Sequence, residues 1–379
     1  MLAARVSMNL DELNFDLPPE RIAQHPLAAR DASRMLLLDR TTGAWEDRQF
    51  REFPDLLRGN ELIVLNNARV LPARLFGRRV GIHAEPPGIH NPARHEHLQS
   101  PIEVLLVRQL SPDTWETLVR PGRKISVGEK IIFGEAGNDG EGELAAVAES
   151  RGEYGLRTMR FTSKTGFHEA LSRLGHIPLP PYIKRADEPA DRERYQTIYA
   201  RQGSAVAAPT AGLHFTPEVL QRIRARGIEI AEITLDVGLG TFEPVRSERL
   251  EDHKIHVESY EVPEATAQAI IKAQNEARPV LAIGTTVVRA LEDAAEKAAS
   301  SNSGSTALTP GKSEAAIFLY PGKPLRLVNQ LLTNFHLPQS SLLALVATLA
   351  GRENILRAYR HAVAAEYRFY SYGDCMLIR

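Results

Sequence analysis

The chain has little cysteine and no long apolar run. Cys375 is the single cysteine among 379 residues, so neither an intrachain disulfide nor a Cys-x-x-Cys metal site can form. The longest apolar stretch, residues 342–351, is about half as long as a membrane-spanning helix. The N-terminal letters MLAARVSMNLDEL contain no apolar core followed by a cleavage site. We therefore expect no secretion signal, no membrane contact, and a reducing, cytoplasmic setting.

Charge of one sign is also lacking. The net charge of −1 argues against a protein that coats nucleic acid indiscriminately. Arginine and lysine nevertheless gather in Gly- and Pro-containing loops: Arg69, Arg74, Arg78, Arg79, Arg120, Arg123, Lys124, Lys184, Arg185, Arg192, Arg194 and Arg201. Guanidinium groups bind phosphates bidentately, so a neutral protein can still present a basic stripe. The alternative is a set of solvated faces.

The order of apolar runs predicts an α/β fold with an insertion. The composition, 43% hydrophobic and 25% charged, is that of a globular protein, and this length favours two or three domains. Short strand-like runs separated by Gly, Pro and Asp turns fill residues 68–160, which predicts a small antiparallel β-barrel. Residues 1–67 and 161–379 are expected to form one discontinuous α/β domain, with helices on a mixed or largely parallel sheet.

Capping signals and apolar patterns place the elements of that domain. Thr216 and Gly227 are expected to begin and end a helix. Further helices are expected at 262–279, 286–299, 340–351 and 354–369, and strands at 33–40, 60–67, 228–238, 280–286, 316–320 and 330–335. The tract 83–101 reads as a mobile loop, and 300–313 as a linker or disordered loop. Ligands of such sheets bind at the carboxyl ends of strands, where DVGLGTF, IGTT and TNFHLP fall.

Two glycine-rich stretches resemble nucleotide-binding loops. TPGKS (309–313) lacks the earlier glycine and the preceding strand of a phosphate-binding loop, so we regard it as spurious. Asp236, Gly238 and Gly240 imitate the acidic-Gly-x-Gly loop of many methyltransferases, but Pro244 discourages the helix that should follow. An ordinary tight turn is the alternative, although glycines there would let the backbone approach a ligand closely.

Histidines on loops are the candidate proton-transfer groups, because imidazole titrates near neutrality. His214 lies one turn before a helix N-terminus, a position that favours anions. His253 and His256 have a metal-binding spacing, but no third ligand is evident. His336 follows an apolar strand, which is more typical of a structural histidine.

Nine longer motifs in the sequence resemble those of a known protein family. They are FDLPPERIAQHPLAARDASRMLLLDR, NNARVLPARLFG, GHIPLPPYIKR, RYQTIYARQGSAVAAPTAGLHFT, GLGTFEPVR, HKIHVESYE, AIGTTVVRALE, TNFHLPQSSLLALV and YRFYSYGDCMLI. Their content and order resemble those of the S-adenosylmethionine:tRNA ribosyltransferase-isomerase family over nearly the whole chain. The resemblance implies an α/β domain with an inserted β-barrel. One departure is Asp236, where the family usually has His before VGxGTF.

The resemblance also implies a reaction of queuosine biosynthesis. The ribosyl part of S-adenosylmethionine is transferred and isomerised onto 7-aminomethyl-7-deazaguanine at the tRNA wobble position, giving epoxyqueuosine, adenine and methionine. The partner is a tRNA with a GUN anticodon, S-adenosylmethionine is a substrate, no metal or other cofactor is required, and we expect a monomer. The sulfonium acidifies the 5′-carbon, so a base is needed there, and adenine leaves more readily when a general acid protonates it. We expect His214, Asp236 and His256 to share these proton transfers.

The chemistry of this reaction also suggests candidates for substrate binding. Gly212, Gly238 and Gly240 would admit the nucleoside, and Thr241 or Thr285 would bind its hydroxyls. Candidates for contacts with tRNA phosphate, the methionine carboxylate or a flipped base are Arg69, Arg74, Arg246, Tyr367, Tyr372 and Asp374. A buried structural role is the alternative for the last three. Two rival functions stay open, a methyltransferase and a non-catalytic RNA-binding module.

Overall fold

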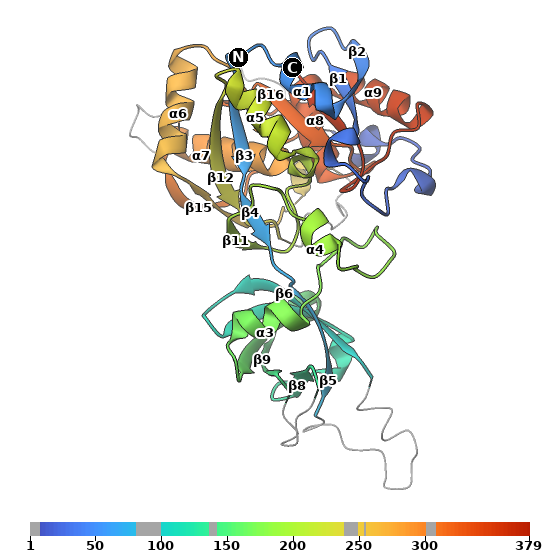
Figure 1. The fold of residues 1–379 in the computed structure, drawn as a ribbon, viewed down its shortest axis with the longest axis vertical. Coiled ribbons are helices and arrows are strands. Elements are labelled where there is room, and N and C mark those ends of the chain that lie inside the picture. Colours follow the sequence, from blue (N-terminus) through green and yellow to red (C-terminus); the bar gives the residue numbers. More distant parts are fainter. Residues whose placement is uncertain (1–7, 81–99, 136–141, 239–248, 254, 301–307) are drawn as a thin grey trace. The chain divides into compact units, whose positions relative to one another are not determined.

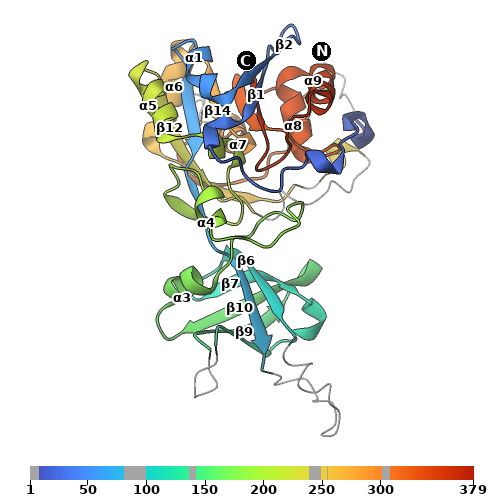
Figure 2. The same ribbon diagram turned by 45° about the vertical axis from the view of Figure 1, so that its right-hand side comes forward.

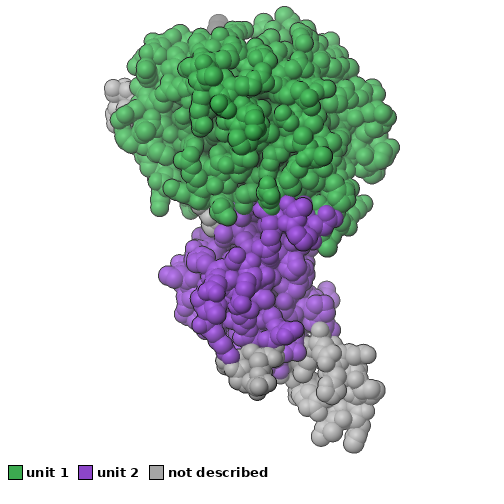
Figure 3. All heavy atoms as spheres, viewed as in Figure 1, with its two compact units in different colours: residues 1–69, 180–186, 193–379 green, residues 70–179, 187–192 purple. Residues whose placement is uncertain are grey.

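The computed structural model describes residues 8–80, 100–135, 142–238, 249–253, 255–300 and 308–379. The chain divides into two compact units, coloured separately in Figure 3. Unit 1 comprises Met1–Arg69, Pro180–Ala186 and Glu193–Arg379, and unit 2 comprises Val70–Leu179 and Asp187–Arg192. The predicted domain bounds, 68–160 for the inserted β-barrel and 1–67 with 161–379 for the discontinuous α/β domain, stay a prediction.

Unit 1 is built on a mixed sheet, as the sequence predicted. In the described part of the chain this sheet has nine strands, in the order β15-β13-β12-β3-β14-β16-β17-β1-β2 (Figure 1). The central strands β12, β3, β14 and β16 are mutually parallel, β17 is antiparallel to β16, and β1 is parallel to β17. In chain order, the strands are β1 (Arg34–Leu38), β2 (Trp45–Gln49), β3 (Leu62–Asn66), β12 (Glu229–Leu235), β13 (Glu258–Val262), β14 (Val280–Ile283), β15 (Gly311–Ala315), β16 (Gln330–Asn334) and β17 (Cys375–Ile378).

Apolar residues of alternating orientation give this sheet a core on each face. Along β3, Leu62 and Val64 pack into the core that contains residues of α6, α7, α8 and α9, whereas Ile63 and Leu65 pack into the core with α1 and α5. All five residues of β3 are buried, as is typical of strands covered on both faces. The helices are α1 (Phe53–Leu56), α5 (Pro217–Ala225), α6 (Glu264–Asn275), α7 (Thr285–Ser300), α8 (Ser341–Ala350) and α9 (Arg352–Ala364).

Helix α5 shows how local sequence fixes an element boundary. The hydroxyl of Thr216 accepts a hydrogen bond from the Val219 N–H at 3.3 Å, and Pro217 begins the helix. Gly227 follows the helix with φ of 73°, a conformation that glycine adopts without strain. The expected start and end of this helix are therefore confirmed.

Three expectations about elements were wrong. Residues 316–320 are not a strand; the strand β15 lies directly before them, where it pairs with β13, and Ile317 and Leu319 are apolar because they pack into the core. The expected linker 300–313 therefore overlaps α7 and β15, and its residues 301–307 lie outside the described residues, as do 81–99. The last expected helix ends at Ala364 instead of 369.

Unit 2 contains a closed antiparallel barrel with the strand order β10-β7-β6-β5-β8-β9, which confirms the predicted barrel (Figure 2). Closure removes the exposed strand edges. Helix α3 (Phe167–Leu174), absent from the sequence prediction, brings Phe167 against Trp115 and Phe161 of the barrel, with ring centroids 5.6 and 5.1 Å away. The barrel strands are β5 (Arg74–Arg79), β6 (Ile102–Gln109), β7 (Thr114–Arg120), β8 (Lys130–Phe133), β9 (Leu144–Arg151) and β10 (Leu156–Ser163).

The remaining elements are short. β4 (Ala68–Val70) and β11 (Gln202–Ala205) form a two-stranded sheet, and α4 is Asp191–Arg194. Single 3-10 turns occur at η1 (Leu10–Leu13), η2 (Pro19–Arg21), η3 (Arg30–Ala32), η4 (Phe50–Glu52), η5 (Gly122–Lys124), η6 (Glu153–Gly155), η7 (Thr210–His214) and η9 (Leu250–Asp252). Of the helices that are described, none is long and apolar enough to cross a membrane.

Candidate functional site

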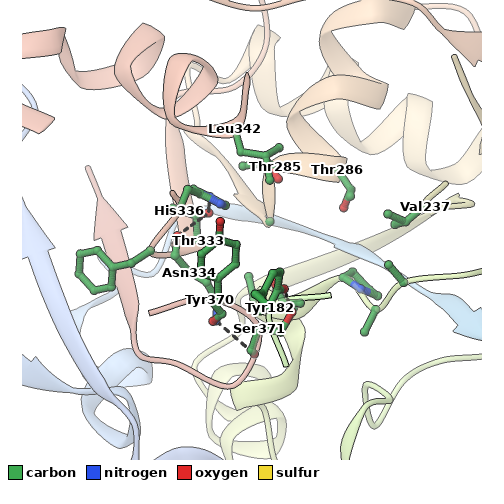
Figure 4. A pocket seen from close by; sticks show the side chains of 17 residues that line it. Tyr182, Val237, Thr285, Thr286, Thr333, Asn334, His336, Leu342, Tyr370 and Ser371 are labelled. Carbon is green, nitrogen blue, oxygen red and sulfur yellow. Dashed lines mark hydrogen bonds between the residues drawn. The ribbon is translucent and has the colours of Figure 1, made fainter. Parts of the chain in front are cut away.

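A pocket in unit 1 lies at the carboxyl ends of the parallel strands (Figure 4). Val237 follows β12, Thr285 follows β14, and Thr333 and Asn334 end β16, so three strands contribute to it. Ala211 of η7 also lines it. The strand edge at which ligand binding was predicted therefore contains a pocket, and Ala211 and Val237, which are far apart in sequence, both line it. The lining residues are Tyr182, Ala207, Ala208, Pro209, Thr210, Ala211, Val237, Gly284, Thr285, Thr286, Thr333, Asn334, Phe335, His336, Leu342, Tyr370 and Ser371.

Hydrogen bonds hold the strand ends around this pocket. Gly284 has φ of 96° and donates its N–H to Leu332 O at 2.8 Å, which turns the chain from β14 into α7. The first-turn N–H groups of a helix have no intrahelical acceptor, so this end of α7 is suited to polar or anionic ligand groups. Asn66, at the end of β3, accepts from Leu235 N–H at 3.0 Å and donates to Thr286 Oγ1 at 3.3 Å. The amide thereby ties β12 and α7 to the central strand.

His336 is the imidazole that lines the pocket. Its Nε2 is 2.8 Å from Thr333 Oγ1, and its backbone N–H donates to the Tyr359 hydroxyl at 3.1 Å. Burial lowers the pKa of His336 to about 3, so the ring is neutral at physiological pH. Sequence reasoning gave it a structural role, although its place directly after an apolar strand at the binding edge was a usable signal.

Two tyrosines whose rings contact each other at a tilt form another wall of the pocket. The ring centroids of Tyr182 and Tyr370 are 3.9 Å apart, with an angle of 37° between the planes. The Tyr182 hydroxyl lies 2.6 Å from Ser371 Oγ, and Figure 4 shows these residues grouped on one side of the pocket. Sequence reasoning selected Tyr367 and Tyr372 from this segment and missed Tyr370 between them.

His214 does not line the pocket. It is 3% exposed, its Nδ1 lies 2.7 Å from Ser33 Oγ, and its ring packs against Phe50 with centroids 5.3 Å apart. Burial lowers the pKa of His214 to about 4, and the cations Arg30 and Arg368 lower it further, while a hydrogen bond with the Asn334 side chain opposes the shift. His214 therefore lies one layer behind the pocket wall.

Asp236 and His256 lie near the pocket without lining it. Asp236 precedes the lining residue Val237 and donates its N–H to Ser259 O at 3.0 Å. His256 lines a second, smaller pocket, which shares Leu342 with the first. The three proton-transfer candidates predicted from the sequence, His214, Asp236 and His256, thus lie near the pocket, but none of them is among its lining residues.

A buried ion pair borders the second pocket. Arg289 of α7 pairs with Glu258 of β13, and the guanidinium donates to His256 O at 3.0 Å. The other oxygen of Glu258 accepts the Gly238 N–H at 3.0 Å. The carboxylate therefore fixes the chain just after β12, and Gly238 has a structural contact that the sequence did not reveal.

The other nucleoside-binding candidates differ in whether they line the pocket. Thr285 lines the pocket, whereas Gly212 packs behind it, where an added Cβ would meet the Tyr199 hydroxyl at 2.1 Å. Gly212 is therefore required by packing. Gly240, Thr241 and Arg246 lie outside the described residues.

Arg69 and Arg74, two of the candidates for phosphate or carboxylate binding, differ in their contacts. Arg69 is exposed on β4. Arg74, in unit 2, pairs with Glu103 at 3.1 Å and donates to Leu179 O at 3.1 Å. An existing ion pair leaves Arg74 less available to a phosphate than an exposed guanidinium.

The three C-terminal candidates have structural contacts. Tyr367 is fully buried, and its hydroxyl donates to Asp47. Tyr372 packs edge-on against Tyr195, with centroids 5.8 Å apart. Asp374 accepts the N–H groups of Arg34 and Arg368, each at 2.8 Å, and burial raises its pKa. None of the three lines the pocket. Among the side chains that are described, no group of three or more His, Cys, Asp or Glu residues could hold a metal ion.

Known proteins resemble this chain over nearly its full length. Residues 10–378 match the family model described as queuosine biosynthesis protein. The S-adenosylmethionine:tRNA ribosyltransferase-isomerase of Solibacter usitatus is 52% identical, with 98% of this chain and 100% of the relative covered, and that of Moorella thermoacetica is 48% identical with the same coverage. A solved structure, the S-adenosylmethionine tRNA ribosyltransferase of Thermotoga maritima, is 32% identical, covers 97% of this chain and 100% of its own, and has a TM-score of 0.50.

Proposed function

This chain belongs to the queuosine biosynthesis protein family, and we propose that the pocket at the carboxyl edge of its sheet binds S-adenosylmethionine. The enzyme is an S-adenosylmethionine:tRNA ribosyltransferase-isomerase. It transfers and isomerises the ribosyl moiety of S-adenosylmethionine onto 7-aminomethyl-7-deazaguanine at the tRNA wobble position, and epoxyqueuosine, adenine and methionine are the products. The observation that supports this location most is the meeting of three strand ends, a helix N-terminus and a neutral imidazole in one pocket.

The reaction needs proton transfers at three places. The sulfonium acidifies the 5′-carbon, so a base removes a proton there. An acid that protonates the adenine ring helps the base to leave. The substrate amine, a cation in water at neutral pH, must lose a proton before its nitrogen attacks C4′. The opened aldehyde then closes to the epoxide while methionine departs. A well-placed acid or base contributes roughly a hundredfold to ten-thousandfold to such a step.

We assign one of these transfers to His336, because its neutral ring reaches the pocket. Asp236 and His256 stay candidates for the other two proton transfers. Asp236 directly precedes a residue that lines the pocket, and His256 lines the second pocket. His214 is better suited to positioning, because it does not line the pocket, whereas Asn334, with which it interacts, does. Thr285, Thr286 and Thr333 line the pocket and are candidates for contacts with the ribose.

We further propose that the tRNA has a GUN anticodon, that no metal or additional cofactor takes part, and that the enzyme acts as a cytoplasmic monomer. The sulfonium itself supplies the activation that a cofactor would otherwise provide. Exposed Arg69 and the described loop arginines are candidates for contacts with tRNA phosphates.

A labelling experiment tests the reaction against its nearest rival. The enzyme is incubated with methyl-labelled S-adenosylmethionine and a tRNA that carries the aminomethyl precursor. We expect the label to leave as free methionine together with one adenine per modified tRNA. Label retained on the RNA would indicate a methyltransferase, and tRNA binding without adenine release would indicate a non-catalytic RNA-binding protein.

A further inference from the structure

Tyr370 has a backbone conformation that is unusual for its side chain. Its φ is 73°, in the left-handed region, which a bulky residue rarely adopts unless the surrounding structure enforces it. The residue lines the pocket, and its ring contacts that of Tyr182 at a tilt. Strained residues cluster at ligand sites, so the conformation itself calls for a functional explanation.

Three hydrogen bonds enforce the conformation of Tyr370. Its N–H donates to Phe335 O at 3.1 Å. Its carbonyl accepts from Asn334 Nδ2 at 2.9 Å and from the Gly373 N–H at 2.9 Å. The end of strand β16 therefore holds the segment that carries the aromatic wall.

Buried polar side chains lie behind Asn334. The interaction of His214 with the Asn334 side chain opposes the fall in the pKa of His214, and both Asn334 Oδ1 and His214 Nε2 are buried. His214 Nδ1 lies 2.7 Å from Ser33 Oγ, and Ser33 Oγ donates to Arg30 O at 3.2 Å. Ser33 and His214 therefore form a buried layer behind the amide of Asn334, whose Nδ2 donates to the Tyr370 carbonyl.

We propose that the contacting pair Tyr182–Tyr370 is the binding surface for a purine-type base, and that Ser33, His214 and Asn334 are positioning residues for it. A flat heteroaromatic ring stacks on an aromatic side chain regardless of its exact substituents. Ala207, Ala208 and Pro209 also line the pocket, and their apolar side chains suit the faces of such a ring.

The inference rests on the proposed function for the identity of the base. The reaction involves two purine-type bases, the adenine of S-adenosylmethionine and the deazaguanine of the tRNA. Two measurements distinguish them: the dissociation constant of S-adenosylhomocysteine without tRNA, and the KM of the precursor tRNA at saturating S-adenosylmethionine.

The test compares three variants of the full chain. Tyr370→Leu removes the ring, and Tyr370→Phe keeps it. Tyr320→Leu is the matched control, because Tyr320 is half-buried beside Phe318 and lines neither pocket. We expect Tyr370→Leu to weaken one of the two bases by roughly 5- to 150-fold, the range of base–aromatic stacking. Tyr370→Phe and Tyr320→Leu should stay within about threefold of the parent enzyme.

Each outcome decides the proposal. A change confined to S-adenosylhomocysteine assigns the wall to adenine, and one confined to the tRNA KM assigns it to the deazaguanine. If Tyr370→Leu leaves both constants within threefold, or weakens both only as much as Tyr320→Leu does, the proposal is overturned. Adenine release by the parent enzyme is measured in parallel, so failure of the proposed function appears as no turnover in every protein, whatever the binding constants.

The positioning role has its own readout. Asn334→Asp removes the donor to the Tyr370 carbonyl and should weaken the same base as Tyr370→Leu does. In the double variant the two effects should fall well short of additive, because both act through one ring. Full additivity would contradict a positioning role for Asn334.

Discussion

His336 and His214 are both buried and neutral, yet their surroundings give them different tasks. His336 reaches the pocket and bonds to Thr333, whereas His214 bonds to Ser33 and faces Asn334. A depressed pKa alone therefore does not identify a proton-transfer group; access to a ligand does.

Replacing His336 tests the chemical step. His336→Gln keeps a polar group beside Thr333 but removes the titrating ring. We expect kcat to fall roughly a hundredfold to ten-thousandfold, while the affinity for S-adenosylhomocysteine changes by less than about threefold. Single-turnover adenine release and equilibrium binding give the two numbers. A variant with near-parental kcat would remove His336 from the mechanism.

His214 makes a prediction about stability and pH. Its pKa falls from 6.5 in the unfolded chain to about 4 in the fold, so the unfolded state binds more protons between these values. Its contribution, on the order of 3 kcal/mol, is complete above pH 6.5 and lost as the pH falls towards 4. Denaturant unfolding at several pH values should show His214→Gln with a shallower fall in the free energy of unfolding. Parallel pH curves for parent and variant would contradict the assigned burial.

Among the helices and strands, a buried carboxylate fixes the entry to β16. Glu292 of α7 accepts the N–H groups of Arg326, Leu327 and Val328 at 2.6, 2.9 and 2.8 Å. The loop before β16 is thus attached to α7, and the pocket residues at the far end of β16 depend on that attachment.

Glu292→Gln should destabilise the fold, because an amide N–H₂ then faces backbone donors that need an acceptor. We expect a loss of about 1–3 kcal/mol in the free energy of unfolding, measured with urea. Glu296→Gln, one turn further along α7 in a more exposed pair with Lys323, is the matched control and should change it by less than about 0.5 kcal/mol. Equal effects of the two variants would show that the three hydrogen bonds add nothing.

Local signals predicted those elements that local chemistry determines. Thr216 and Gly227 define a helix by capping, and the continuous apolar run of β3 identifies a strand buried on both faces. Local signals gave a wrong prediction where pairing with a distant strand determines which residues form a strand. Residues 316–320 have the composition of a strand, but the ladder with β13 forms on the polar segment Gly311–Ala315. Nothing within either segment reveals where a distant strand will pair.

The sequence predicted at which edge of the sheet the candidate site lies, but not which side chains line it. The carboxyl ends of strands located the pocket, since topology alone determines that edge. The sequence could not indicate whether Tyr367, Tyr370 or Tyr372 faces inward, because that depends on a left-handed backbone enforced by Asn334. His214 was selected for its loop, yet Ser33, 181 residues earlier, places it in a second layer.

At the scale of the whole molecule, the candidate pocket is built by one of the two units. Every lining residue of the candidate pocket belongs to unit 1, although these residues come from segments between Tyr182 and Ser371 that are far apart in sequence. The family relationship covers both units, from residue 10 to residue 378. The proposal that S-adenosylmethionine binds at the carboxyl edge of the sheet is therefore a claim about unit 1.

A crystal structure of the enzyme with S-adenosylhomocysteine tests this claim most directly. The account predicts density for the nucleoside in the pocket, within contact distance of Thr285, Thr333 and His336. Density bound elsewhere, with this pocket empty, would contradict the account and with it the role of His336.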